Sequence, residues 1–101
     1  MRKSNEQSLK EIIGELLDSN GHARRKIAEV NLVNDWSELV GPLIAKNTEK
    51  IYIAHEKLIL HITSAPLRNE LQLSRSRIVE LVNEHAGIEL IKDVMLLGGI
   101  K

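Results

Sequence analysis

Apolar residues recur at helical spacing near the start of the chain. Ser8 with Glu11 has the spacing of a capping box, while Ser4 with Gln7 offers an earlier start. Asn20-Gly21 supplies a stop. The pattern predicts a first amphipathic helix whose apolar positions are Leu9, Ile12, Ile13, Leu16 and Leu17.

A second helical pattern covers residues 22–40, but its apolar stripe drifts around the helix. This drift predicts either one long helix covered on two sides or a break near Asn31. Gly41-Pro42 then interrupts the pattern, and residues 43–46 add a short helical turn. The positions on one face are Ala23, Ile27 and Val30, and those farther round are Val33, Trp36 and Val40.

Two short stretches of alternating residues, 51–54 and 58–63, predict a β-hairpin. Pairing Ile53 with Leu58 puts the apolar residues of both strands on one face and leaves a four-residue loop. This loop contains no glycine, so the pattern favours a type I turn over a tight primed turn. The outer face of the sheet is expected to carry Tyr52, Ile59, His61 and Thr63.

Ser64 and Pro66 predict the start of a third long helix, which continues to Ala86-Gly87. Residues 90–97 are rich in Ile, Leu and Val and predict a last strand. The element order is helix, helix, strand, strand, helix, strand, which predicts an α+β fold. Because strand-helix-strand connections are nearly always right-handed parallel crossovers, we expect a mixed three-stranded sheet with the helices mainly on one face.

Composition favours one small cytoplasmic domain over residues 1–101. The chain has no cysteine, which excludes disulfides, zinc–thiolate sites and thiol nucleophiles. Its longest apolar runs are four residues, too short to cross a bilayer, and the first ten residues do not resemble a signal peptide.

The balance of 14 basic and 14 acidic residues argues against a dedicated nucleic-acid binder. Contacts with phosphates would therefore come from a local set. The alternative is that these side chains pair with nearby acids, for example Arg77 with Glu80 or Glu84. Arg68 and Arg75 are seven residues apart and are expected on one side of their helix. The full candidate set is Arg24, Arg25, Lys26, Arg68, Arg75 and Arg77.

No motif predicts catalysis, a metal or another cofactor. The histidines lack the helical spacing that aims two imidazoles at one metal ion, and Glu80 and Glu84 lie on the polar face of their helix. Phosphate-binding glycine loops and nucleophile elbows are absent from the sequence. We therefore expect no enzyme; the four histidines are His22, His55, His61 and His85.

Two aromatic residues are few for base stacking, which single-strand binders usually provide at several positions. Trp36 falls in an apolar helical stripe and is expected in the core. Tyr52 and Ile59 lie on the outer strand face, where a homo-oligomer could form, and Leu73 points away from the stripe of its helix. Tyr52, Ile59 and Leu73 are thus the candidate partner surface.

The chain resembles the DciA family in the order and spacing of several segments. Trp36, Val40-Gly41 and the following Ala45-x-x-Thr48 match the family pattern within residues 34–48. One departure is Leu67, which stands where the family commonly has a second Trp. The other matching segments are the leading amphipathic helix, residues 57–65, Glu70-Leu71 and the last strand.

This family was formerly defined as a domain of unknown function and described as a candidate RNA-binding protein, and its members act with the bacterial replicative helicase. The resemblance implies a K-homology-like fold, with Trp36, Val40 and Gly41 in structural roles. It implies a non-enzymatic replication adaptor that binds the helicase and assists its loading or activity on single-stranded DNA. The alternative is a stand-alone module that binds RNA or single-stranded DNA, although no G-x-x-G loop joins two helices here.

Overall fold

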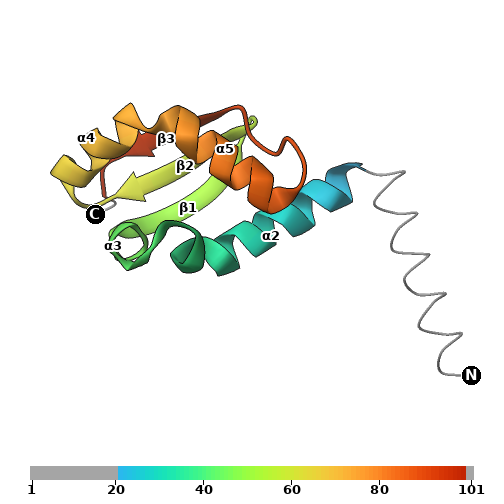
Figure 1. Cartoon of the computed structure of the whole chain (residues 1–101), viewed down its shortest axis with the longest axis horizontal. Helices are drawn as coiled ribbons and strands as arrows, with labels where there is room; N and C mark the ends of the chain where they lie inside the picture. The colour runs from blue at the N-terminus through green and yellow to red at the C-terminus, as the bar shows by residue number, and fades with distance from the viewer. Residues whose placement is uncertain (1–20, 100–101) are drawn as a thin grey trace, which may run out of the picture.

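The computed structural model describes residues 21–99, and the predicted first helix lies outside these residues. The predicted α+β class and element order are confirmed. The elements, seen in Figure 1, are α2 (Gly21–Val40), α3 (Pro42–Lys46), β1 (Thr48–Ala54), β2 (Lys57–Ile62), α4 (Ala65–Leu73), α5 (Arg75–Ala86) and β3 (Asp93–Leu97).

The three strands form one mixed sheet in the order β1-β2-β3. β1 is antiparallel to β2, and Ile53 lies opposite Leu58 as predicted. β3 is parallel to β2, with Val94 opposite Leu58. Because parallel neighbours need a crossover connection, α4 and α5 carry the chain from the end of β2 back to the start of β3.

Alternate positions of the strands meet the helices in one hydrophobic core. Leu58, Leu60 and Ile62 of β2 are completely buried, and they cluster with Leu32 of α2 and Val82 of α5. Successive side chains of a strand point to opposite faces, so these residues define the inner face of the sheet. Burial of each such side chain stabilises the fold by about 1.5–3 kcal/mol.

The helix α2 continues without a break through Asn31, so the alternative of a break is wrong. Ala28, Leu32 and Trp36 recur every four residues and are buried against the core. The drift of the sequence pattern comes from a second apolar side, which no other described residue buries. Its residues remain 43–50% exposed and are Ile27, Val30 and Val33.

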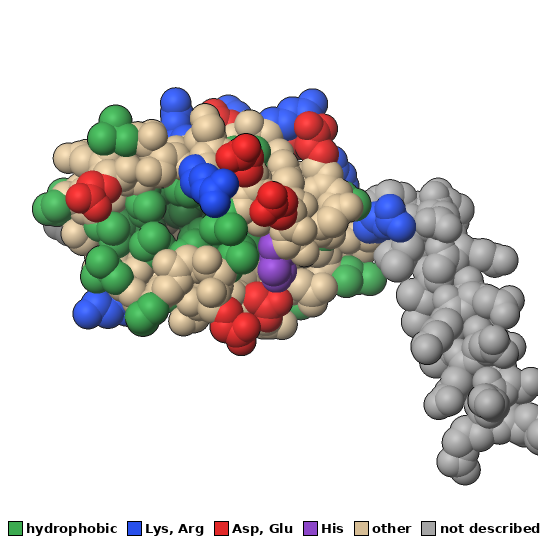
Figure 2. All heavy atoms as spheres, in the orientation of Figure 1, with side chains coloured by type: hydrophobic (Ala, Val, Ile, Leu, Met, Phe, Trp, Pro, Cys, Tyr) green, Lys and Arg blue, Asp and Glu red, His purple; other side chains and the backbone are tan. Residues whose placement is uncertain are grey.

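Apolar side chains also gather over the end of the molecule where α3 and α4 lie (Figure 2). Leu43 of α3 is 60% exposed and Leu73 of α4 is 90% exposed. The short helix α3 follows Gly41, whose φ of +90° and ψ of 165° favour glycine. Open space surrounds the position of a Cβ there, so the backbone conformation and not crowding requires the glycine.

The predicted four-residue hairpin loop with a type I turn is wrong. Ala54 pairs with Lys57, so that His55 and Glu56 alone form the turn, with φ angles of +52° and +63°. Positive φ at both residues is typical of the primed type I′ turn, whose twist matches that of the flanking strands. The cost of this conformation without glycine is offset by contacts of Glu56, whose carbonyl accepts a 2.7 Å hydrogen bond from the N–H of Lys92.

The predicted third helix is in fact two helices. α4 ends at Leu73 and α5 begins at Arg75, with Ser74 between them at φ −110° and ψ 17°. The N–H of Ser74 donates to the carbonyl of Leu71 at 3.0 Å, three residues earlier, which tightens the last turn. Helical periodicity continues across this junction, since Leu71 and Ile78 are both buried, and this concealed the break in the sequence.

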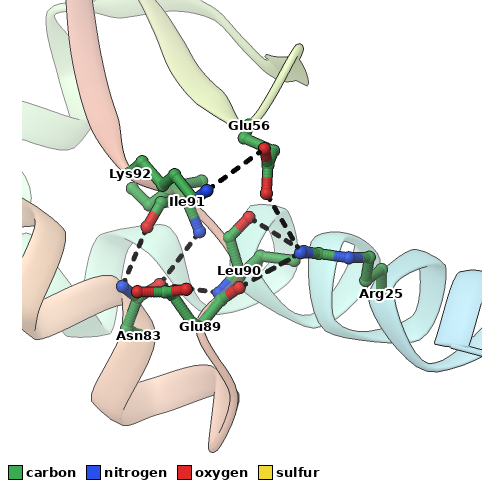
Figure 3. A network of polar contacts seen from close by, with 7 residues as sticks. All are labelled: Arg25, Glu56, Asn83, Glu89, Leu90, Ile91 and Lys92. Carbon is green, nitrogen blue, oxygen red and sulfur yellow. Dashed lines mark hydrogen bonds and ion pairs between the residues drawn. The ribbon is translucent and has the colours of Figure 1, made fainter.

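The last strand starts at Asp93 and not at Leu90 as predicted. Leu90 and Ile91 are nonetheless buried, and the side chain of Asn83 satisfies their backbone (Figure 3). Its Oδ1 accepts hydrogen bonds from the N–H groups of Leu90 (2.9 Å) and Ile91 (3.0 Å), while its Nδ2 donates to the carbonyl of Ile91 (3.0 Å). A side chain of α5 thus replaces the strand partner that these groups would otherwise need.

Candidate nucleic-acid and partner interface

Arg25, one of the basic candidates, is built into the fold. Its Nη1 donates to the carbonyls of Glu89 (3.3 Å) and Leu90 (3.2 Å), and its Nη2 lies 3.4 Å from Oε2 of Glu56 (Figure 3). One guanidinium therefore connects α2, the hairpin turn and the loop before β3. Since carbonyl and carboxylate oxygens occupy its donors, Arg25 has a structural role in the described residues.

Glu56 links the same three segments from the other side. Its Oε1 lies 3.7 Å from Nζ of Lys92, and its Oε2 faces Arg25. These ion pairs are about half exposed and contribute little singly. Together with the hydrogen bond from Lys92 N–H, however, they hold Glu56 in the left-handed conformation that the turn requires.

A pocket of about 320 Å³ opens beside this network, between α2 and the hairpin turn. Lys26 and His55 line it, as does Glu29, whose carboxylate accepts a 3.2 Å hydrogen bond from the N–H of Ile53. The pocket mixes basic and acidic groups and so lacks the one-sided charge of an anion site. Arg24 and Lys26 are both exposed at this end of α2.

The three arginines of α4 and α5 do not form one row. Arg68 and Arg75, expected on one side of a single helix, belong to separate helices. On the face seen in Figure 2, basic side chains alternate with acidic ones. The contacts of the three side chains are Arg68 Nη1 to the carbonyl of Ile62 (2.6 Å), Arg75 Nη1 to Asp93 Oδ2 (4.0 Å) and Arg77 Nη1 to Glu80 Oε1 (3.6 Å).

Trp36 is 5% exposed and connects three elements. Its Nε1 donates to Oγ1 of Thr48 at 3.0 Å, and that hydroxyl donates to the carbonyl of Ile44 at 2.7 Å. The chain of bonds joins α2, α3 and β1. Val40 packs partly buried against the core beside it, so the Trp, Val-Gly and Thr positions are all used in this corner of the fold.

The outer face of the sheet is different, because no described helix covers it. The pairing of the strands places its side chains in two cross-strand rows. Ile59 is only 5% exposed although it does not belong to the core cluster, so its neighbours on this outer face bury it. The rows are Tyr52–Ile59–Met95 and Lys50–His61–Leu97.

Two rings and a cation meet on this outer face. The rings of Tyr52 and His61 stack with their centroids 6.0 Å apart and their planes 26° apart, and Nζ of Lys50 lies 5.2 Å from the Tyr52 centroid. Nδ1 of His61 lies 3.1 Å from the carbonyl oxygen of Gly98, to which it donates. The strand pattern predicted Tyr52 and His61 on one face. Lys50 lies opposite His61 in the predicted register, but it was missed because the predicted strand began at Ile51.

Leu73, the third candidate for partner contact, is 90% exposed at the last residue of α4. His85 is instead partly buried, with Nε2 2.9 Å from Oδ2 of Asp35.

Within residues 21–99, no three His, Asp or Glu side chains are grouped to hold a metal ion. The same residues include no helix that is long and apolar enough to span a membrane.

Comparison with known proteins identifies a family that matches this chain. The family model described as "Dna[CI] antecedent, DciA" matches residues 8–96, which is most of the chain. No curated protein and no solved structure matches. Such a match implies a helicase-loader role in DNA replication and an interaction with the replicative helicase, in a family that is not known for enzymatic activity.

Proposed function

We propose that this chain, which belongs to the DciA family, is an adaptor that binds the bacterial replicative helicase and assists its loading or activity on single-stranded DNA. The family match over residues 8–96 is the observation that carries the proposal. The described residues support it through their exposed apolar and basic side chains, which suit contacts with macromolecules.

In this proposal the contact with the helicase centres on Leu73. Because this leucine is 90% exposed, its side chain contributes favourable burial energy only when a partner covers it. Arg75 and Arg77 come after Ser74 at the start of α5, where they provide a polar rim around an apolar anchor. Interfaces commonly concentrate their binding energy in a few such central residues.

The basic candidates contribute unequally in this proposal. Arg24 and Lys26 are exposed on α2 and serve as phosphate contacts, whereas the contacts of Arg25 serve the fold. Each phosphate contact releases counterions, so the affinity for DNA falls as salt rises.

The direct test is a pull-down and an unwinding assay with the helicase of the same organism. We expect the two proteins to associate and unwinding to be stimulated. Absence of both effects at micromolar protein would reject the proposal. The variant Leu73→Ala should weaken association about tenfold or more while leaving the melting temperature unchanged, because an interface anchor is lost without a core contact. Val30→Ala removes another exposed apolar side chain, on α2 and away from this end of the molecule, and is the matched control.

A stand-alone module that binds RNA or single-stranded DNA is the second candidate. The observation that favours it is the pair of stacked rings beside Lys50 on the outer face of the sheet. Such a module would bind oligonucleotides with a steep dependence on salt and would not associate with the helicase. The pull-down separates the two functions.

A further inference from the structure

We infer that the outer face of the sheet is a binding platform for single-stranded nucleic acid, on which bases stack against Tyr52 and His61 while Lys50 and Arg68 contact phosphates. The inference rests on the proposed function and deepens it, since it adds to the phosphate contacts proposed for Arg24 and Lys26 a base-stacking surface that is separate from Leu73. The two rings lie on neighbouring strands, and both remain partly exposed.

Two exposed rings favour single-stranded nucleic acid as the ligand of this outer face. Every base has a flat face, so the rings can stack against bases of any sequence. The sequence had suggested too few aromatic residues for such a role. Trp36 is indeed unsuitable, being 5% exposed with its Nε1 bonded to Thr48. The fold supplies a second ring by stacking His61 beside Tyr52, 6.0 Å between centroids. The bond from Nδ1 of His61 to the carbonyl of Gly98 fixes the imidazole in place.

Positive charge borders the rings at one end of the sheet. Nζ of Lys50 lies 5.2 Å from the centroid of the Tyr52 ring. Nη1 of Arg68 lies 3.8 Å from the position of a Cβ on Gly98, so this guanidinium borders the residue that anchors His61. Arg68 spends one donor on the carbonyl of Ile62 and has further N–H groups for a phosphate.

Acidic groups also lie near the outer face. Oε2 of Glu49 lies 3.7 Å from the position of a Cβ on Gly99, so among the described residues a carboxylate lies near Lys50 and Arg68. At the other end of the outer face, Lys57 and Asp93 are cross-strand partners of opposite charge. Arg75 also pairs with Asp93 at that end, so what distinguishes the end with the rings is cations placed beside aromatic faces, an arrangement that suits a nucleic-acid strand with its negative backbone.

A second copy of the chain fits this outer face less well. The central Ile59 is already 5% exposed, so a partner would gain little by covering it. The aliphatic side chains that remain are Met95 at 40% and Leu97 at 36% exposure. Stable interfaces bury about 1,200–2,000 Å² in total with an apolar centre, whereas this outer face has rings and a cation at its exposed positions.

Photocrosslinking tests the unmodified protein. A single-stranded oligothymidine that carries 5-iodouracil is irradiated with the full chain, and the adducts are mapped by mass spectrometry. We expect crosslinks at Tyr52 or His61. Crosslinks confined to other residues, or no binding of the oligonucleotide by the wild type, would overturn the inference.

Affinity measurements by fluorescence anisotropy test the roles of the residues. The double variant Tyr52→Leu/His61→Leu should raise the Kd for the oligonucleotide about tenfold or more, because it removes the flat rings and keeps apolar bulk. Tyr52→Phe keeps a ring and should bind like the wild type. Lys50→Gln should reduce the slope of log K against log salt by about one, while the matched control Lys57→Gln should not.

The outcomes separate this inference from the proposed function. Loss of DNA binding by the double variant with an unchanged helicase pull-down supports the platform. Unchanged DNA binding overturns it and leaves the adaptor role standing. Loss of helicase association, or a wild-type dimer in light scattering that the double variant dissociates, assigns this outer face to a protein partner and also overturns it.

Discussion

The strand β2 presents two faces that differ in kind. Its inner residues Leu58 and Leu60 are completely buried under the helices, whereas Ile59 and His61, which alternate with them, point to the opposite side. The inner face is aliphatic throughout, and the outer face combines an aliphatic residue with rings and charges. One strand thus packs the core with one set of alternate residues and places the other set on the face that we propose to bind nucleic acid.

The largest effect is expected on the inner face. Leu60→Ala should lower the free energy of unfolding by about 2–5 kcal/mol, because it leaves a cavity in the core that neighbours fill only partly. Urea unfolding followed by circular dichroism measures this loss. Met95→Ala on the outer face is the control and should cost less than about 1 kcal/mol, since Met95 is 40% exposed. Equal losses would break the distinction between the faces.

A smaller effect is expected where the hairpin is held in register. A slip by one residue would exchange the two faces, and the contacts of Arg25 oppose it by tying Glu56 to the loop before β3. Arg25→Met should lower the free energy of unfolding by about 1–2 kcal/mol, because the carbonyl of Leu90 loses a hydrogen-bond partner. Lys26→Met, its exposed neighbour, should change stability by about 0.5 kcal/mol or less. A larger loss of stability in Lys26→Met than in Arg25→Met would contradict the stabilising role assigned to Arg25.

The smallest effect is expected when the same conservative substitution is made on each face of β2. Ile62 lies on the inner face of β2 and Ile59 on its outer face, and both are buried. Ile62→Val and Ile59→Val each remove one methylene-sized group, and each should lower the free energy of unfolding by about 0.5–1.5 kcal/mol. We expect the lower cost at Ile59, because surface side chains can move to fill the space left there. Thermal unfolding under identical conditions measures both. The reverse order would mean that the outer face is as tightly packed as the core.

Local sequence pattern predicted much of the fold correctly. The alternation around Ile53 and Leu58 predicted their pairing, and the order of elements predicted the parallel crossover. The same pattern failed at Ser74, because helical periodicity continues through a junction between two helices. It also failed at Leu90, where the side chain of Asn83 and not a strand partner satisfies the backbone.

The candidate site was predicted in part. Tyr52 and Ile59 were expected on the outer face, and they lie opposite each other there. The basic set was expected to act together, yet Arg25 and Arg68 are bonded to backbone carbonyls of separate loops and strands. Such contacts join residues far apart in the chain, so spacing alone could not reveal them.

The sequence by itself determined which residues alternate and which recur at helical spacing, because these properties depend on neighbours along the chain. It did not determine that Ile27 and Val30 stay exposed, because that depends on which side of α2 the rest of the fold covers. Tertiary structure alone decided the primed turn at His55 and Glu56, since its cost is offset by Lys92 and Arg25, which are distant in sequence. It likewise decided that the ring of His61 stacks on that of Tyr52 and that Lys50 reaches the Tyr52 ring, because strand pairing puts these residues on one face but does not fix their rotamers.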